Sequence, residues 1–97
     1  MRTVLVRYRV KPDRVAENEE LVRAVYAELA ETRPAGFRYA TFKLDDGVSF
    51  VHFALDDARN SLSGVAAFQR FQEGIRERCD EPPVVAELEL VGTYDLV

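Results

Sequence analysis

Four segments of the chain have the hydrophobic pattern and residue types of β-strands. Residues 3–10 are dominated by β-branched and aromatic side chains and are followed by Pro12, which lacks the N–H that a ladder needs. Residues 37–44 and 48–55 have the same character, and the turn signal Asp45-Asp46-Gly47 between them predicts a hairpin. Residues 84 to about 94 alternate well enough to predict a fourth strand.

Between the first two strands, apolar residues recur every three or four positions, which predicts an amphipathic helix. It begins at about Pro12 or Asp13, and the carboxylate of Asp13 can cap it. It ends at about Thr32, because Pro34 and then Gly36, which accepts a positive φ, follow. This helix therefore has a defined start and stop.

A second helix is predicted after a polar loop over residues 56–64. Gly74 lies inside this helix at a cost of about 1 kcal/mol relative to alanine, which indicates close packing against the sheet. Asp80–Pro83 is expected to end the helix. Its apolar positions, at helical spacing, are Val65, Phe68, Phe71, Ile75 and Cys79.

The element order β-α-β-β-α-β predicts a ferredoxin-like α+β fold. Two right-handed crossovers place the strands of an antiparallel four-stranded sheet in the order 4-1-3-2, with both helices on one face. The length of 97 residues suffices for one domain, over residues 1–97, and for a thin core.

The third strand is apolar on both of its faces. Val51, Phe53 and Leu55 point one way, and Phe50 and Ala54 flank His52 on the other. Two helices cover only one face of a sheet, so we expect a second copy of the chain to cover the other face across a two-fold axis. The sequence thus predicts a homodimer.

Composition excludes several classes of function. A net charge of −4 leaves no excess of cationic side chains for a phosphate backbone, so no nucleic acid is expected as a partner. One cysteine and one histidine form neither a disulfide nor a Cys/His metal cage, and the 56–61 loop lacks the spacing of a calcium loop, so no metal is expected. The charged start of the chain, Met1–Arg7, predicts neither a signal peptide nor a membrane span and hence a cytosolic location.

Three short segments carry a resemblance to a known family: the strand end Val10-Lys11-Pro12, the strand start Gly36-Phe37-Arg38-Tyr39, and Ala67-Phe68-Gln69-Arg70-Phe71 in the second helix. With the element order, they make the chain similar to the dimeric α/β-barrel superfamily, and most similar to its antibiotic biosynthesis monooxygenase branch. The resemblance covers nearly the whole chain. It implies that two ferredoxin-like sheets close into a barrel across a dimer.

The resemblance also implies an activity. Enzymes of that family are often cofactor-free oxygenases that act on polycyclic phenols or quinols, so it implies a monooxygenase for a small aromatic or quinol substrate with no cofactor. A related branch degrades haem, but its usual tryptophan is missing here, since the chain has no Trp. The competing interpretation is a dimeric module that binds a small ligand or a partner without catalysis.

His52, Tyr8 and Tyr39 are the polar candidates for such a site. His52 has the side chain whose ordinary pKa lies near neutrality, so it is a candidate base; the alternative is a buried neutral imidazole with a hydrogen-bonded neighbour. Tyr8 and Tyr39 are candidates to donate a hydrogen bond to a substrate oxygen; in the core they would instead find a backbone acceptor.

Arg7 is a further candidate for the chemistry. It shares a strand face with Arg9, and we expect one of the two to lie close to His52 and to bind a phenolate or carboxylate. The alternative is ion pairing across a dimer interface with Glu87 and Glu89.

Aromatic side chains are expected to form the walls of a substrate cavity between the sheet and the helices. We take Tyr8, Phe53, Phe68 and Phe71 as its lining, with plain core packing as the alternative. Strand alternation puts Phe53 and His52 on opposite faces, so only one of them can line that cavity.

Overall fold

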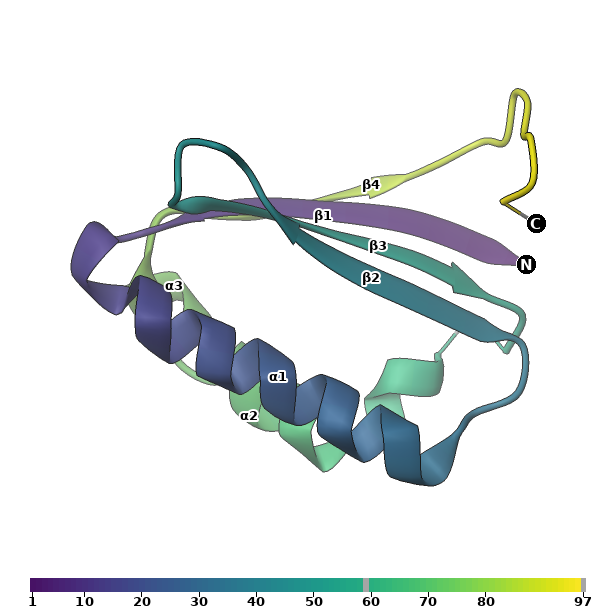
Figure 1. The fold of residues 1–97 in the computed structure, drawn as a ribbon, viewed down its shortest axis with the longest axis horizontal. Helices are drawn as coiled ribbons and strands as arrows, with labels where there is room; N and C mark the ends of the chain where they lie inside the picture. Colours follow the sequence, from purple (N-terminus) through teal and green to yellow (C-terminus); the bar gives the residue numbers. More distant parts are fainter. Residues whose placement is uncertain (59, 97) are drawn as a thin grey trace.

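The computed structural model describes residues 1–58 and 60–96. Its sheet has the strand order β2-β3-β1-β4, with antiparallel neighbours throughout, and α1 and α2 lie on one face of it (Figure 1). This is the predicted ferredoxin-like order read from the opposite edge. The strands are β1 (Arg2–Val10), β2 (Phe37–Lys43), β3 (Ser49–Asp56) and β4 (Cys79–Glu87); the helices are η1 (Pro12–Arg14), α1 (Val15–Thr32), η2 (Ser61–Gly64), α2 (Ala66–Gln72) and α3 (Ile75–Arg78).

The ends of α1 agree only in part with the prediction. Asp13 lies in the 3₁₀ turn η1, and no side chain caps η1 or α1, so the predicted cap is wrong. At the other end Arg33 adopts a left-handed conformation with φ 45° and donates its backbone N–H to the Leu29 carbonyl. Gly36 then has φ 69°, as the sequence predicts.

The second predicted helix is broken at Gly74. The helix α2 ends at Gln72, Gly74 takes φ 70°, and the short α3 follows. A Cβ atom at Gly74 would meet only Arg78 Nη1, at 4.0 Å. The expectation that Gly74 packs closely against the sheet is therefore wrong, and the glycine is there for its backbone conformation.

The fourth strand begins and ends earlier than the sequence predicts. β4 begins at Cys79, so Pro82 and Pro83 lie within it instead of ending the helix before it. Prolines are tolerated there because β4 is an edge strand that pairs with β1 alone. Past Glu87, the backbone N–H of Leu88 donates to the Thr3 carbonyl at 2.8 Å, and the chain then leaves the sheet.

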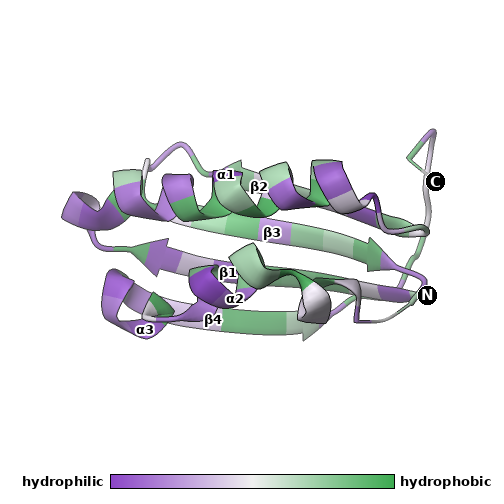
Figure 2. Cartoon of the chain, turned by 90° about the horizontal axis from the view of Figure 1, so that it is seen from below, coloured by the Kyte–Doolittle hydropathy of each residue, from purple (hydrophilic) through white to green (hydrophobic). Residues whose placement is uncertain are grey.

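Helices α1 and α2 lie side by side across the sheet (Figure 2). Glu28 of α1 joins them, since its carboxylate accepts the backbone N–H groups of Ala66 and Ala67 at 3.1 and 2.9 Å. The buried core lies between these helices and the sheet and consists of Tyr8, Val10, Val22, Val25, Phe50, Val65, Ala67, Phe71 and Cys79.

None of the helices in the described part of the chain is long and apolar enough to cross a membrane.

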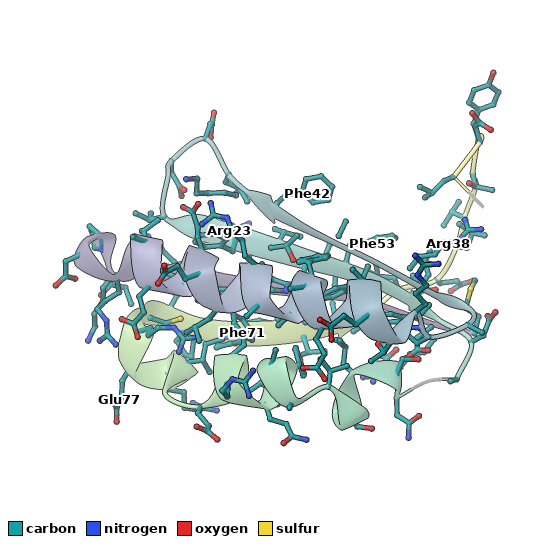
Figure 3. The ribbon with its side chains drawn as sticks, turned by 60° about the horizontal axis from the view of Figure 1, so that its bottom comes forward. Arg23, Arg38, Phe42, Phe53, Phe71 and Glu77 are labelled. Carbon is teal, nitrogen blue, oxygen red and sulfur yellow. The ribbon has the colours of Figure 1, made fainter. Side chains whose placement is uncertain are left out.

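The register of the sheet fixes which residues face the helices. Val6 pairs with His52, and Leu5 pairs with Phe53, so these two pairs lie on opposite faces. Phe53 and Phe42 are on the side away from the helices, whereas Phe71 lies between α1 and α2 (Figure 3). Phe42 is 59% exposed and Val84 68% exposed. The outer face of the sheet thus presents apolar side chains that the described helices leave uncovered.

Candidate functional site

A cavity of about 680 Å³ lies between the helices and the sheet. All four strands contribute to its floor, and α2, α3 and η2 form its walls. Several residues of its rim are exposed, so the cavity reaches solvent there. The apolar lining includes Val6, Phe37, Ala54, Phe68, Phe71, Ile75 and Val85, and the exposed rim is formed by Asn60, Ser63, Gln69 and Gln72.

His52 stands on the cavity floor with both ring nitrogens engaged. Tyr8 Oη lies 2.7 Å from Nε2, and Tyr39 Oη lies 2.5 Å from Nδ1. Thr41 Oγ1 is a weaker neighbour of Nδ1 at 3.3 Å and lies 2.8 Å from Tyr26 Oη. Tyr8, Tyr39 and His52 all line the cavity, as do the charged residues Arg2 of β1 and Asp56 of β3.

Two further buried residues extend the cluster behind Tyr8. Asn18 of α1 is fully buried and donates from Nδ2 to Tyr8 Oη at 3.0 Å. Arg78, 2% exposed, donates from Nε to Asn18 Oδ1 at 3.3 Å. Its other nitrogens donate to the carbonyls of Phe71 and Glu73 at 2.6 and 3.0 Å. The result is a continuous hydrogen-bonded chain from Arg78 to Tyr39.

Burial sets the charge of this cluster. It lowers the pKa of His52 to about 4, so the imidazole is neutral at pH 7. It raises the pKa of both Tyr8 and Tyr39, so their hydroxyls stay protonated. Arg78 is the one cation of the chain of bonds, and among the described residues no carboxylate forms an ion pair with it.

Comparisons with known proteins place this cavity in a recurrent fold. No family profile and no curated protein matches the sequence. Solved structures do: one described as an antibiotic biosynthesis monooxygenase is 19% identical, covers 95% of this chain and 100% of that chain, and has a TM-score of 0.73. Rv0793 from Mycobacterium tuberculosis is 24% identical, with coverage of 95% and 96% and a TM-score of 0.70. SnoaB, a cofactor-independent oxygenase from Streptomyces nogalater, is 22% identical, with coverage of 97% and 96% and a TM-score of 0.71.

The chain has the fold of the antibiotic biosynthesis monooxygenases. The fold that the sequence led us to expect is thereby confirmed. At these identities the likeness concerns the fold alone, and what the cavity does depends on its own residues.

Within this antibiotic biosynthesis monooxygenase fold, most of the predicted site residues meet. His52, Tyr8, Tyr39, Phe68 and Phe71 all line the cavity. The cavity between helices and sheet is itself the feature that the sequence led us to expect of an oxygenase.

Two predicted residues lie elsewhere. Phe53 is on the outer face of the sheet and does not line the cavity, because strand alternation sends it away from His52. Arg7 is exposed on that same outer face, where its strand partner is Val51. The expectation that Arg7 or Arg9 lies close to His52 is therefore wrong.

The ion pairs of the described chain lie within it, and the predicted pairing of the arginines across a dimer interface stays a prediction. Arg9 pairs with Glu81 at 3.3 Å, and Glu87 pairs with Arg2 at 3.0 Å, both within one chain. Glu89 lies past the end of β4.

Asn18 and Arg78 are the site residues that sequence reasoning missed. One signal was present for Asn18: it lies among Val15, Val22 and Val25 on the apolar face of its helix, where a polar residue needs a buried partner. Arg78 gave no such signal, because its burial depends on the break at Gly74.

Among the described residues, no group of three or more His, Cys, Asp or Glu side chains is placed to hold a metal ion.

Proposed function

We propose that this chain is a cofactor-independent monooxygenase for a small aromatic phenol or quinol. The observation that carries the proposal is the cavity of about 680 Å³ with an aromatic lining and a hydrogen-bonded cluster, His52 with its two tyrosines, on its floor. An apolar cavity with a few convergent polar groups is the usual form of a small-molecule site. The description of SnoaB as a cofactor-independent oxygenase supports the same activity on this fold.

The chemistry asks for an ionised, electron-rich ring that can transfer an electron to dioxygen. For a ring that carries a CH2 group, as in an anthrone, dioxygen supplies one oxygen atom to form C=O and the other leaves with both hydrogens as water. Phe68 and Phe71 would pack against the ring. The hydroxyl of Tyr39, joined to His52, would hold the phenolic oxygen and stabilise its negative charge.

His52 itself has no free nitrogen for a substrate, since Tyr8 and Tyr39 occupy both. A base role would require one tyrosine hydroxyl to move aside or to relay the proton. Burial also holds the pKa of His52 at about 4, which makes the imidazole a weak base at pH 7. We therefore assign the cluster to binding and stabilising an ionised oxygen.

We also propose that the working form is a homodimer. The outer face of the sheet carries Leu5, Val51, Phe53 and the exposed Phe42 and Val84. Phe42, Val51, Arg7 and Val84 are successive cross-strand neighbours, so these apolar side chains lie around the exposed Arg7. Exposed apolar side chains gathered on one face in this way support an interface. A second copy packed face to face would cover both sheets at once and complete the barrel that the sequence resemblance implies.

A binding module without catalysis is the second candidate. The satisfied hydrogen bonds of His52 favour it, because a cluster of this kind can hold a ligand oxygen without moving a proton.

Oxygen uptake with a panel of hydroquinones and anthrones tests the proposal. We expect uptake by the wild-type protein, a loss of about tenfold or more in Tyr39→Phe because an oxyanion donor is gone, and no change in Tyr94→Phe, the same substitution at a residue 93% exposed. Saturable binding of the panel without uptake would favour the binding module. If the protein shows no oxygen uptake and no binding with any member of the panel, both candidates are contradicted.

A further inference from the structure

Arg78 determines how the amide of Asn18 is oriented. A guanidinium group has only donors, and its Nε lies 3.3 Å from the side-chain oxygen of Asn18. Turning the amide over would place two donors against each other in a fully buried position. The NH2 group of Asn18 must therefore face Tyr8, 3.0 Å away.

The direction of the next hydrogen bond follows. Tyr8 Oη accepts a hydrogen bond from the Asn18 amide, so the Tyr8 O–H needs an acceptor of its own, and His52 Nε2 lies 2.7 Å away. If Nε2 carried the imidazole proton instead, the buried O–H of Tyr8 would find no acceptor among these partners. A neutral imidazole has one N–H, so that N–H is on Nδ1 and donates to Tyr39 Oη at 2.5 Å.

We propose that Arg78 and Asn18, which do not touch the cavity, are positioning residues that fix His52 as the Nδ1–H tautomer and so make the Tyr39 hydroxyl a hydrogen-bond donor toward the ligand. Each bond from Arg78 to Tyr39 donates in the same direction. Since its oxygen already accepts from Nδ1–H, the Tyr39 hydroxyl has its own proton left to donate, and Thr41, a hydrogen-bonding neighbour of Tyr39, is the alternative acceptor when no ligand is present.

The direction of these hydrogen bonds favours one class of ligand. This inference about the ligand rests on the proposed function. The cavity offers a donor at its polar floor, so it prefers an oxygen that only accepts, such as a phenolate, over the protonated phenol. Ionised phenols bind such donors through charge-assisted hydrogen bonds.

Nitrogen-15 NMR tests the tautomer without any ligand. His52 is the only histidine of the chain, so its two ring nitrogens are identified without further variants. At pH 7 we expect a pyrrole-type Nδ1 and a pyridine-type Nε2, with the other tautomer disfavoured by about tenfold or more. A pyrrole-type Nε2 in the wild-type protein would overturn the proposal.

Asn18→Asp reverses the chain of bonds with almost no change in shape. The carboxylate accepts from both Arg78 and the Tyr8 hydroxyl, so Tyr8 then accepts from Nε2–H, and Nδ1 accepts from Tyr39. We expect the NMR signature to switch to Nε2–H. Ala27→Asp adds the same carboxylate on the exposed side of α1, away from the cavity, and should leave the tautomer as in the wild type. An unchanged tautomer in folded Asn18→Asp would count against the positioning role.

Binding of 4-nitrophenol separates this inference from the proposed function. Its ionised form has its own absorbance, and we expect that form to bind about tenfold more weakly to Asn18→Asp than to the wild type, because the Tyr39 donor is lost. Ala27→Asp should change the affinity by about twofold at most. If the ligand fails to bind while the Nδ1–H tautomer is found, the proton direction stands and the proposed function fails. Equal phenolate binding by the two aspartate variants would overturn the ligand preference.

Discussion

The hydroxyl oxygen of Tyr8 lies 2.7 Å from Nε2 of His52, although the two residues are 44 positions apart. The pairing of β1 with β3 brings them together, because Tyr8 is opposite Phe50 and His52 is opposite Val6 on the same face. Such diagonal neighbours in a sheet are within reach of long aromatic side chains. The backbone register therefore sets the geometry of the cavity floor.

The histidine should make stability depend on pH. Burial holds the pKa of His52 at about 4 in the folded state, below the value of about 6.5 in the unfolded chain. The unfolded state thus binds more protons between these values, so the stabilisation is fully present above pH 6.5 and is lost as the pH falls through 4. The loss is about 3 kcal/mol. Urea unfolding at several pH values measures it, with His52→Gln as the control that lacks this part of the slope. An NMR titration midpoint of His52 near 6.5 would refute the prediction.

Removing the Tyr8 hydroxyl should lower the free energy of unfolding. Tyr8→Phe leaves the Asn18 amide and His52 Nε2 without their partner in a buried place, at a cost of about 1–3 kcal/mol in the free energy of unfolding. Tyr94→Phe is the matched control, because Tyr94 is exposed. Equal stabilities of the two variants in urea would show that the Tyr8 hydroxyl contributes nothing.

The outer face of the sheet should decide the oligomeric state. A lysine in place of Phe53 or Val84 would have to lie buried and unpaired between two sheets, so we expect these variants to be monomers of 11.0 kDa. Light scattering after size exclusion should give twice that mass for the wild type. Ala27→Lys, on the exposed side of α1, should remain dimeric. A wild-type monomer at micromolar concentration would contradict the dimer.

A side chain at Gly74, where the helix is broken, should destabilise the protein. Gly74→Ala adds a methyl group that meets nothing closer than 4.0 Å, so its cost comes from φ 70° and is about 1–2 kcal/mol. Gly64→Ala, at a glycine with open space and no positive φ, should have little effect. Thermal unfolding compares the two. A Gly74→Ala protein as stable as Gly64→Ala would show that the break is not strained.

Periodicity was sufficient to predict the order of the elements and the faces of the central strands. It also predicted that His52 and Phe53 cannot share a cavity, but not which of them faces the helices, because both faces of β3 are apolar. The side of the sheet that the helices cover depends on the handedness and packing of the crossovers as a whole.

The hydrophobic periodicity of the sequence could not predict the hydrogen-bonded row behind the cavity. Helical spacing runs straight through Gly74, so it predicts one continuous helix and places Arg78 in an ordinary last turn. The actual break turns the chain so that Arg78 points inward and donates to the carbonyls of Phe71 and Glu73. A tertiary contact of this kind leaves no periodic trace in a sequence.

The position of Arg78 also bears on how this protein can evolve. The same guanidinium closes the end of α2 and begins the row of bonds that reaches His52. A mutation at Arg78 therefore disturbs folding and ligand recognition together, and selection for either one preserves both. New ligand preferences can arise with far less risk at the exposed rim, where side chains touch the cavity but take no part in the row of bonds from Arg78 to Tyr39; these are Asn60, Ser63, Gln69 and Gln72.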